Sequence, residues 1–403
     1  MKTYRFSTVA ALLATASMAV MTGCEYDVSK PQWDEDYNAP PTPVITQIEP
    51  AEAATPGVNT ITIRGENFAA APNTNDVYFG NTAAEIVETS STSIKVRRPT
   101  LVTDSCTVKV ISNQALVVAK YSPYRIDAVL LRYGSFLDNQ ALNTVTVDKE
   151  ENLYVIENSK TIHKIDSIGN KTEIGDAARA PTEARIGPGG TLYMMANNRS
   201  IEQFDLTTGT GLEWIKLASG KVVKYGDFSE FGYLYTGGIR TDLLVIAQDL
   251  TVTSAGAYAS DEIFAVRVYN GYVYVASRTY GTLNPVKIYR HTIDASGTVG
   301  TQELYLDMTT AGDFASRTIK GIAFSSNGTM YLATDATDPI LVVDPATLQV
   351  DIFYKSIVPP YCKYFYWGSK NRLFMISGDT VIGQEWTVYR VDLGSTSAPY
   401  YGE

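Results

Sequence analysis

The chain has 403 residues, of which 45% are hydrophobic and 19% charged, and this composition is typical of two or more ordinary globular domains. Its formal net charge of −10 and its pI near 4.9 argue against general binding of nucleic acid or anionic membranes, because both depend on a cationic surface. With only three cysteines, no disulfide framework is expected.

The N-terminus has the pattern of a secretory signal peptide. Lys2 and Arg5 precede an apolar segment that is too short for a membrane-spanning helix. This segment ends in a run that resembles the lipobox of bacterial lipoproteins, Met21-Thr22-Gly23-Cys24. The resemblance implies that residues 1–23 are removed and that Cys24 is acylated as the mature N-terminus. The alternative is a plain secreted protein in which Cys24 stands there by chance.

Residues 24–42 are expected to form an extended tether. They are rich in acidic residues and proline and have few apolar side chains to bury. The acidic cluster resembles the surface-export signal behind the lipidated cysteine of some Gram-negative lipoproteins. That resemblance implies a lipid-anchored protein of the outer membrane that faces the cell exterior, with the periplasmic face as the alternative.

Residues 43–122 are predicted to form a β-sandwich, because short strands with period-2 alternation follow one another without a helical segment. The segments that resemble the IPT/TIG immunoglobulin-like domain are Ile45 to Pro50, Gly57, Ile61 to Phe68, Val77 to Gly80 and Ala84 to Ile86. We expect Gly65 and Asn67 to form a tight bend and Phe68 to close one end of the sandwich. Such domains are usually spacers or adhesion modules.

Residues 123–403 contain a repeat of roughly 40 residues, the period of a propeller blade with four strands. Each copy has a turn followed by an aliphatic and an aromatic residue, and the aliphatic markers are Leu153, Leu192, Leu234, Val273, Met330 and Leu373. The sequence therefore predicts an all-β protein in which a six-bladed β-propeller follows the sandwich. In general layout the blades resemble the NHL type.

The last repeat ends without a fourth strand, and the segment 125–133 is strand-like but has no blade of its own. We expect this segment to supply the outer strand of the sixth blade, because that pairing closes the ring and removes an exposed edge.

Few residues suggest chemistry. The only two histidines, His163 and His291, are expected at solvated strand positions, and no cofactor or metal site is predicted. An aspartate recurs at one point of the repeat, which predicts that it caps a turn. No catalytic constellation is apparent, so the chain is not expected to be an enzyme. The recurring aspartates are Asp166, Asp205, Asp344 and Asp392.

Ten residues before the aliphatic marker, at the start of the predicted innermost strand, five blades carry polar residues: Asn143, Thr182, Lys224, Lys320 and Lys363. The fourth blade gives no match, which suggests a different turn length. The three lysines are predicted to form a cationic patch at one mouth of the central channel, with Arg185 and Arg267 as further candidates. The alternative is a set of ordinary solvated lysines.

Aromatic residues are the second candidate for binding, since their faces stack on sugar rings. The segment 361–367 is so dense in them that strand alternation cannot place all of its rings on one face. The candidates in this segment are Tyr361, Tyr364, Tyr366 and Trp367, and the isolated candidates are Trp214, Tyr225 and Tyr280. The alternative is packing between blades.

This layout is similar to surface glycan-binding lipoproteins that work beside TonB-dependent transporters and their partner lipoproteins. The resemblance implies capture of a polysaccharide or oligosaccharide for uptake, with lipid as the only membrane contact. Two alternatives stay open: a propeller lyase or glycosidase, and a scaffold that binds protein.

Overall fold

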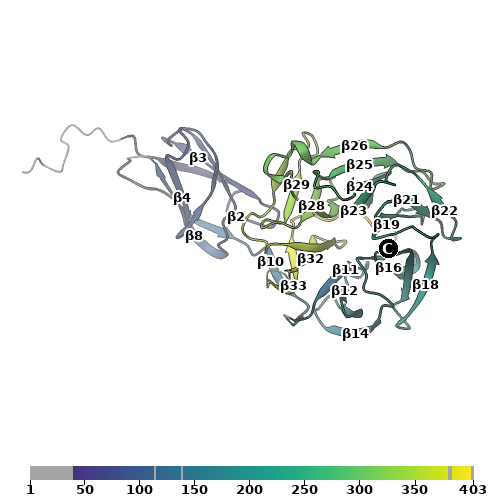
Figure 1. Ribbon diagram of the computed structural model, residues 1–403. Coiled ribbons are helices and arrows are strands. Elements are labelled where there is room, and N and C mark those ends of the chain that lie inside the picture. The colour runs from purple at the N-terminus through teal and green to yellow at the C-terminus, as the bar shows by residue number, and fades with distance from the viewer. Residues whose placement is uncertain (1–39, 113–114, 138, 380–383, 401–403) are drawn as a thin grey trace, which may run out of the picture.

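The computed structural model describes residues 40–112, 115–137, 139–379 and 384–400. They form two all-β domains, a sandwich and a ring of sheets (Figure 1). The signal peptide, Cys24 and most of the tether lie outside the described residues. Within the described ranges, no helix has the length and apolar character needed to cross a membrane. The short 3₁₀ helices that the structure assigns are η1 (Pro188–Gly190), η2 (Met308–Thr310) and η3 (Gly312–Phe314).

The N-terminal domain is a sandwich of two sheets, as the alternation predicts. One sheet has the order β1 (Val44–Glu49), β3 (Thr60–Glu66), β7 (Ser93–Arg97) and β6 (Ile86–Thr89). The other has the order β2 (Ala53–Ala54), β9 (Ala119–Ile126), β8 (Thr103–Ser112), β4 (Asn75–Phe79) and β5 (Thr82–Ala84). Because β9 runs to Ile126, this domain extends past the expected boundary at residue 122.

The predicted bend after β3 has the expected residues in the expected roles. Asn67 has a φ of 61°, a value that asparagine tolerates better than most residues. Phe68 is buried in the core of the sandwich. A Cβ atom on Gly65 would lie 2.4 Å from the Phe68 ring, so only glycine fits beside it.

The rest of the chain forms six four-stranded antiparallel sheets whose innermost strands contact one another in a closed cycle (Figure 1). From the inside outward, blade 1 has β11 (Leu142–Val147), β12 (Leu153–Glu157), β13 (Thr161–Ile165) and β14 (Lys171–Asp176); blade 2 has β15 (Glu183–Ile186), β16 (Leu192–Met195), β17 (Ser200–Asp205) and β18 (Thr210–Lys216); blade 3 has β19 (Tyr225–Phe228), β20 (Leu234–Gly238), β21 (Thr241–Ile246) and β22 (Val252–Ser254). Blade 4 has β23 (Asp261–Tyr269), β24 (Tyr272–Thr279), β25 (Lys287–Thr292) and β26 (Glu303–Asp307); blade 5 has β27 (Ile319–Phe324), β28 (Met330–Thr334), β29 (Ile340–Val343) and β30 (Val350–Ile352); blade 6 has β31 (Cys362–Trp367), β32 (Arg372–Asp379), β33 (Gln384–Asp392) and β10 (Leu130–Tyr133).

The predicted six-bladed propeller is therefore confirmed, and each aliphatic marker lies in the second strand of its blade. The predicted closure is confirmed as well, because β10 pairs antiparallel with β33 and completes blade 6. Only the second half of the segment 125–133 takes this role, since its first two residues end β9 of the sandwich.

The recurring aspartates cap turns, as the repeat predicts. The carboxylate of Asp205 accepts hydrogen bonds from the backbone N–H groups of Thr207 and Thr208, and Asp344 does the same with Ala346 and Thr347. These N–H donors lower the pKa of both carboxyl groups.

The sandwich docks on the outer edge of blades 5 and 6. Tyr354, in the segment after β30, accepts a hydrogen bond from the Gly57 N–H at 2.6 Å and donates one to the Asp392 carbonyl at 2.8 Å. Arg97 of the sandwich forms a bidentate ion pair with Asp351, at 2.8 and 3.1 Å. Partly buried polar contacts of this kind hold the two domains in one orientation.

Candidate functional site

The six innermost strands begin at the same end of the ring axis, which we call the mouth. In blades 1, 5 and 6 the second residue of the innermost strand lies in a β-bulge; these residues are Asn143, Lys320 and Lys363. Thr182 and Lys224 directly precede the innermost strands of blades 2 and 3. Bulges redirect side chains at the rims of closed sheets. The five residues therefore do lie at the start of the innermost strands, as their spacing predicts.

Blade 4 departs from the pattern because its first hairpin is one residue shorter. Val268 pairs with Val273 there, whereas Val147 pairs with Leu153 in blade 1. The bulge of blade 4 consequently falls on Phe264, one position away from where the spacing would place it. The Phe264 side chain is 6% exposed and packs in the core between blades 4 and 5.

The predicted cationic patch is wrong for two of its three lysines. Lys224 pairs with Glu262 of blade 4, with 2.9 Å between Nζ and Oε1, and Lys320 pairs with Asp335 at 3.4 Å. Each carboxylate cancels the charge of its lysine, so these two residues add no net positive charge to the mouth.

Lys363 is different, because its neighbours among the described residues are neutral. Its Nζ donates to the Leu142 carbonyl and to Asn143 Oδ1, both at 2.7 Å, and lies 4.3 Å from the centre of the Trp386 ring. Burial without a carboxylate partner disfavours the charged form and lowers the pKa of Lys363 to about 8. The contacts also tie blade 6 to blade 1.

The two arginine candidates lie deeper along the axis, in a buried ionic cluster. Arg185 is 2.5 Å from Glu183 and 3.5 Å from Asp227, while Arg267 is 2.7 Å from Asp227. All four side chains are buried, so the expectation that the arginines add to a surface patch is wrong. The sequence does not indicate Asp227, because this residue lies some 40 residues from either arginine. Glu183 lies only two residues from Arg185, but nothing in the sequence marks that pair as buried.

Glu183 of this cluster has a strongly shifted pKa. Its burial raises its pKa to about 7, although Arg185, the Tyr364 hydroxyl at 2.8 Å and the Gly226 N–H at 2.7 Å all favour the charged form. The group therefore takes up or releases a proton near neutral pH.

The predicted aromatic platform at 361–367 is wrong for most of its rings. Tyr364, Tyr366 and Trp367 are each 3% exposed or less, because β31 packs on both faces against neighbouring blades. The Trp367 ring meets the Tyr331 ring edge-on, with 5.3 Å between centroids. Tyr361 is half-buried. Packing between blades, the open alternative, describes the three buried rings.

The isolated aromatic candidates have different surroundings. Trp214 lies on β18, the outermost strand of blade 2 and thus the strand furthest from the ring axis, and it packs edge-on against Tyr193. Tyr225 is half-buried beside Lys224, and burial raises the pKa of its hydroxyl. Tyr280 is 41% exposed in the segment after β24, at the mouth end of blade 4.

Cations cover aromatic rings at the mouth end of blades 3 and 4. The Arg240 guanidinium lies 4.9 Å from the centre of the Tyr280 ring, and the Arg278 guanidinium lies 4.8 Å from that of Phe264. The two pairs are neighbours, because Ile239 pairs with Glu262, which in turn pairs with Arg278. Within the described part of the chain, neither arginine has a carboxylate partner. We call Arg240, Tyr280, Arg278 and Phe264 the rim cluster.

The histidines are not solvated, contrary to expectation. His163 is 8% exposed and lies 2.7 Å from Glu157, and His291 is 1% exposed and lies 2.8 Å from the Tyr258 hydroxyl. Burial lowers the pKa of His291, which keeps its ring neutral. Among the described residues, no three His, Cys, Asp or Glu side chains come close enough together to hold a metal ion.

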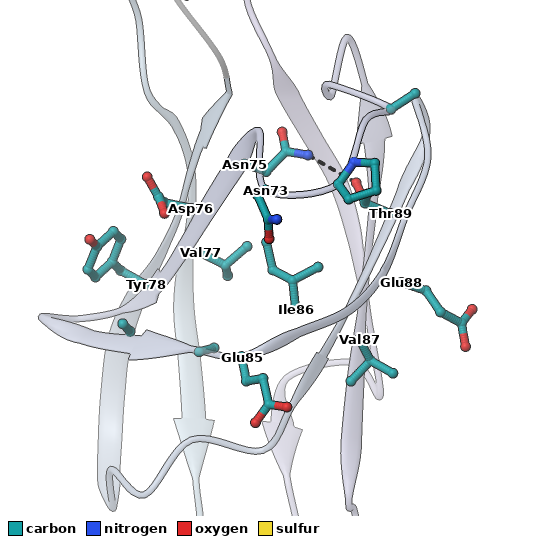
Figure 2. Close-up of a pocket in the computed structure, with 14 residues that line it drawn as sticks. Asn73, Asn75, Asp76, Val77, Tyr78, Glu85, Ile86, Val87, Glu88 and Thr89 are labelled. Atoms are coloured by element: carbon teal, nitrogen blue, oxygen red, sulfur yellow. Dashed lines mark hydrogen bonds between the residues drawn. The ribbon is translucent and has the colours of Figure 1, made fainter.

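The sandwich has a groove of about 480 Å³ between the β4–β5 hairpin and β6 (Figure 2). Figure 2 shows Val77 and Ile86 at its centre and Glu88 pointing outward. Asn75 and Thr89 are joined across one end by a hydrogen bond of 3.0 Å. The groove follows from the open edge where the chain passes from one sheet to the other, and it has no cation–aromatic pair among its lining residues.

Residues 43–125 match the family model of the IPT/TIG domain. The N-terminal domain is therefore an IPT/TIG domain, as its motifs predict. A search of curated proteins finds no match.

Solved structures share the fold of this chain over most of its length. A Bacteroides thetaiotaomicron structural genomics protein of unknown function has a TM-score of 0.52 at 10% identity, and an auxiliary nutrient binding protein from the same species has 0.51 at 11%. In both cases the match covers 88% of this chain and 99% of the other. A gluconolactonase from Xanthomonas campestris has a TM-score of 0.51 at 13% identity and covers 66% of this chain and 90% of its own.

Proposed function

We propose that this protein is a lipid-anchored protein of the outer membrane that captures a polysaccharide or oligosaccharide at the cell surface for a TonB-dependent uptake system. The observation that carries the proposal is the rim cluster, in which two guanidinium groups cover aromatic rings at the mouth end of neighbouring blades. An aromatic face can stack on a sugar ring, and a guanidinium group can donate hydrogen bonds to hydroxyl or carboxylate oxygens.

Two further observations support capture rather than turnover. The shared fold of an auxiliary nutrient binding protein along 88% of this chain is consistent with a binding role in nutrient acquisition. The lipobox-like run before Cys24 and the IPT/TIG domain would hold the propeller away from the membrane. We propose that the chain itself has no glycosidase or lyase activity, and incubation with a glycan panel that yields products would contradict this.

Affinity electrophoresis on gels that contain single polysaccharides tests the proposal. We expect at least one polysaccharide to retard the protein, and Tyr280→Ala and Arg240→Ala to reduce the retardation at least tenfold. Tyr78→Ala, a half-buried tyrosine of the sandwich, is the matched control and should bind as the wild type does. Equal retardation of all variants would contradict the site, and no retardation by any polysaccharide would contradict the function.

Co-purification from the native outer membrane tests the partners. If the protein serves an uptake system, a TonB-dependent transporter and its partner lipoproteins should be recovered with it. Recovery of another membrane protein, together with no retention on any glycan, would instead favour a protein-binding scaffold.

A further inference from the structure

The segment after β33 turns back into the ring at the end of the axis opposite the mouth. The Ala398 N–H donates to the carbonyl of Phe324, the last residue of β27, at 2.8 Å, and Ser397 forms a bridge with Ser325. The Ser326 N–H donates to the Thr396 carbonyl at 2.9 Å. These contacts direct residues 396–400, which we call the tail, toward the innermost strands.

Tyr400 of the tail occupies a slot between an aromatic ring and a cation. Its ring is stacked on Tyr366 of blade 6, with centroids 4.4 Å apart and planes inclined by 19°. The Arg267 guanidinium of blade 4 lies 3.6 Å from the centre of the same ring. Arg185 of blade 2 lies 5.6 Å from it, so three blades meet at one side chain.

The two arginines beside the slot each carry a hydrogen-bond donor that the described residues do not satisfy. Both arginines are 5% exposed or less. Arg185 Nη1 and Arg267 Nε are fully buried and have no hydrogen-bond partner within the described ranges. A buried donor without a partner is unfavourable, because it has lost its hydrogen bonds to water. A phenol ring can cover these cations but cannot accept hydrogen bonds at its face as a carboxylate does.

We propose that the slot between Tyr366 and Arg267 is a binding site for a six-membered ring that bears a carboxylate, and that Tyr400 fills it as an intramolecular ligand. The ring of the ligand stacks on Tyr366, and its carboxylate accepts hydrogen bonds from the unpaired donors of the two arginines. Entry requires the tail to leave, so the apparent affinity falls with the fraction of molecules in which the tail is bound. The site lies at the opposite end of the axis from the rim cluster and does not depend on glycan capture there.

Tyr400→Ala in the full-length protein tests the site, with isothermal titration calorimetry as the assay. Glucuronate and galacturonate represent sugar acids, and 4-hydroxybenzoate represents aromatic acids. We expect at least one of the three to bind the variant at least tenfold more tightly than the wild type. Glucose and phenol, which lack the carboxylate, should gain less. Tyr305→Ala removes another ring covered by a cation, that of Arg290 at 5.3 Å, and is the control that should gain nothing.

Adding Arg185→Gln to Tyr400→Ala should remove most of the gain while the rim cluster still binds its glycan. A folded Tyr400→Ala variant that binds no ring acid better than the wild type would overturn the proposal, as would a gain that survives Arg185→Gln.

If Tyr400→Ala fails to fold, the wild type supplies the measurement. Release of the C-terminal residues by carboxypeptidase should be faster in a saturating ring acid than in glucose, because the ligand and the tail compete for one slot. Equal rates in both would overturn the proposal.

Discussion

The sharpest prediction concerns Glu183, whose pKa of about 7 in the folded protein lies above its ordinary value of 4.5. Because the folded state holds this proton more tightly than the unfolded state does, the neutral carboxyl stabilises the propeller at low pH. That stabilisation is complete below about pH 4.5 and is lost as the pH rises through about 7. The difference in pKa corresponds to about 3.4 kcal/mol, of which about 2.5 kcal/mol falls between pH 5 and pH 8.

Glu183→Gln should therefore flatten the pH dependence of stability by about 2.5 kcal/mol over this range. Its absolute stability should fall as well, because Arg185 loses its closest carboxylate. Unfolding in urea followed by tryptophan fluorescence reports the propeller, since Trp214, Trp367 and Trp386 all lie in it.

A second variant checks the sign of the argument. Tyr364→Phe removes a hydroxyl that donates to Glu183 Oε1 at 2.8 Å and thus favours the charged form. The midpoint of the pH dependence should move upward in this variant. If Glu183→Gln and the wild type lose stability in parallel between pH 5 and pH 8, the carboxyl is not the group that titrates and the reasoning fails.

Two other predictions follow from single contacts. Lys363 has a pKa of about 8, so the rate at which amine reagents modify it, followed by mass spectrometry, should level off above about pH 8. An ordinary lysine amine titrates near pH 10.4. A rate that rises steadily past pH 10 would contradict the burial of its charge. Tyr354→Phe removes the hydroxyl that joins Gly57 to Asp392 and should cost about 1–3 kcal/mol in urea unfolding. Tyr78→Phe, away from the domain interface, is its control and should cost less than 0.5 kcal/mol, as surface changes usually do.

The arrangement of the blades could be predicted because the repeat marks the same structural position six times. Each marker is the first or second residue of a second strand that is buried between its neighbours, so the aliphatic and aromatic residues recur with the blade. The closing strand could be predicted by counting strands. The last repeat has only three strands of its own, and the segment before the first repeat has one strand that belongs to no blade.

The burial of Tyr364 and Trp367 could not be predicted from alternation. Alternation separates buried from exposed positions only in a strand with one solvated face, and β31 has neighbouring blades on both faces. Such a strand can bury rings at successive positions, and β31 holds four aromatic residues in six. Tyr280, by contrast, is 41% exposed in a loop, and the sequence indicates it as an isolated candidate although no repeat pattern places it at the mouth.

The carboxylate partners of the candidate cations could not be predicted from the sequence, for a different reason. Asp227 and Arg267 lie on adjacent innermost strands, one blade apart in the chain, and closure of the ring brings them within 2.7 Å. Nothing near either residue indicates the other. The repeat spacing identifies Lys224 because it compares equivalent positions in different blades. It cannot identify Glu262, the partner of Lys224, because an ion pair joins positions that are not equivalent in the repeat.

The docking of the sandwich fixes how the propeller can be presented. Tyr354 and the Arg97–Asp351 pair attach the sandwich to the edge of blades 5 and 6, whereas the rim cluster belongs to blades 3 and 4. Blades 3 and 4 lie across the ring from the junction of blades 6 and 1, where β10 leaves the sandwich. The sandwich therefore lies on the side of the ring away from the rim cluster, which leaves that cluster open to a large ligand.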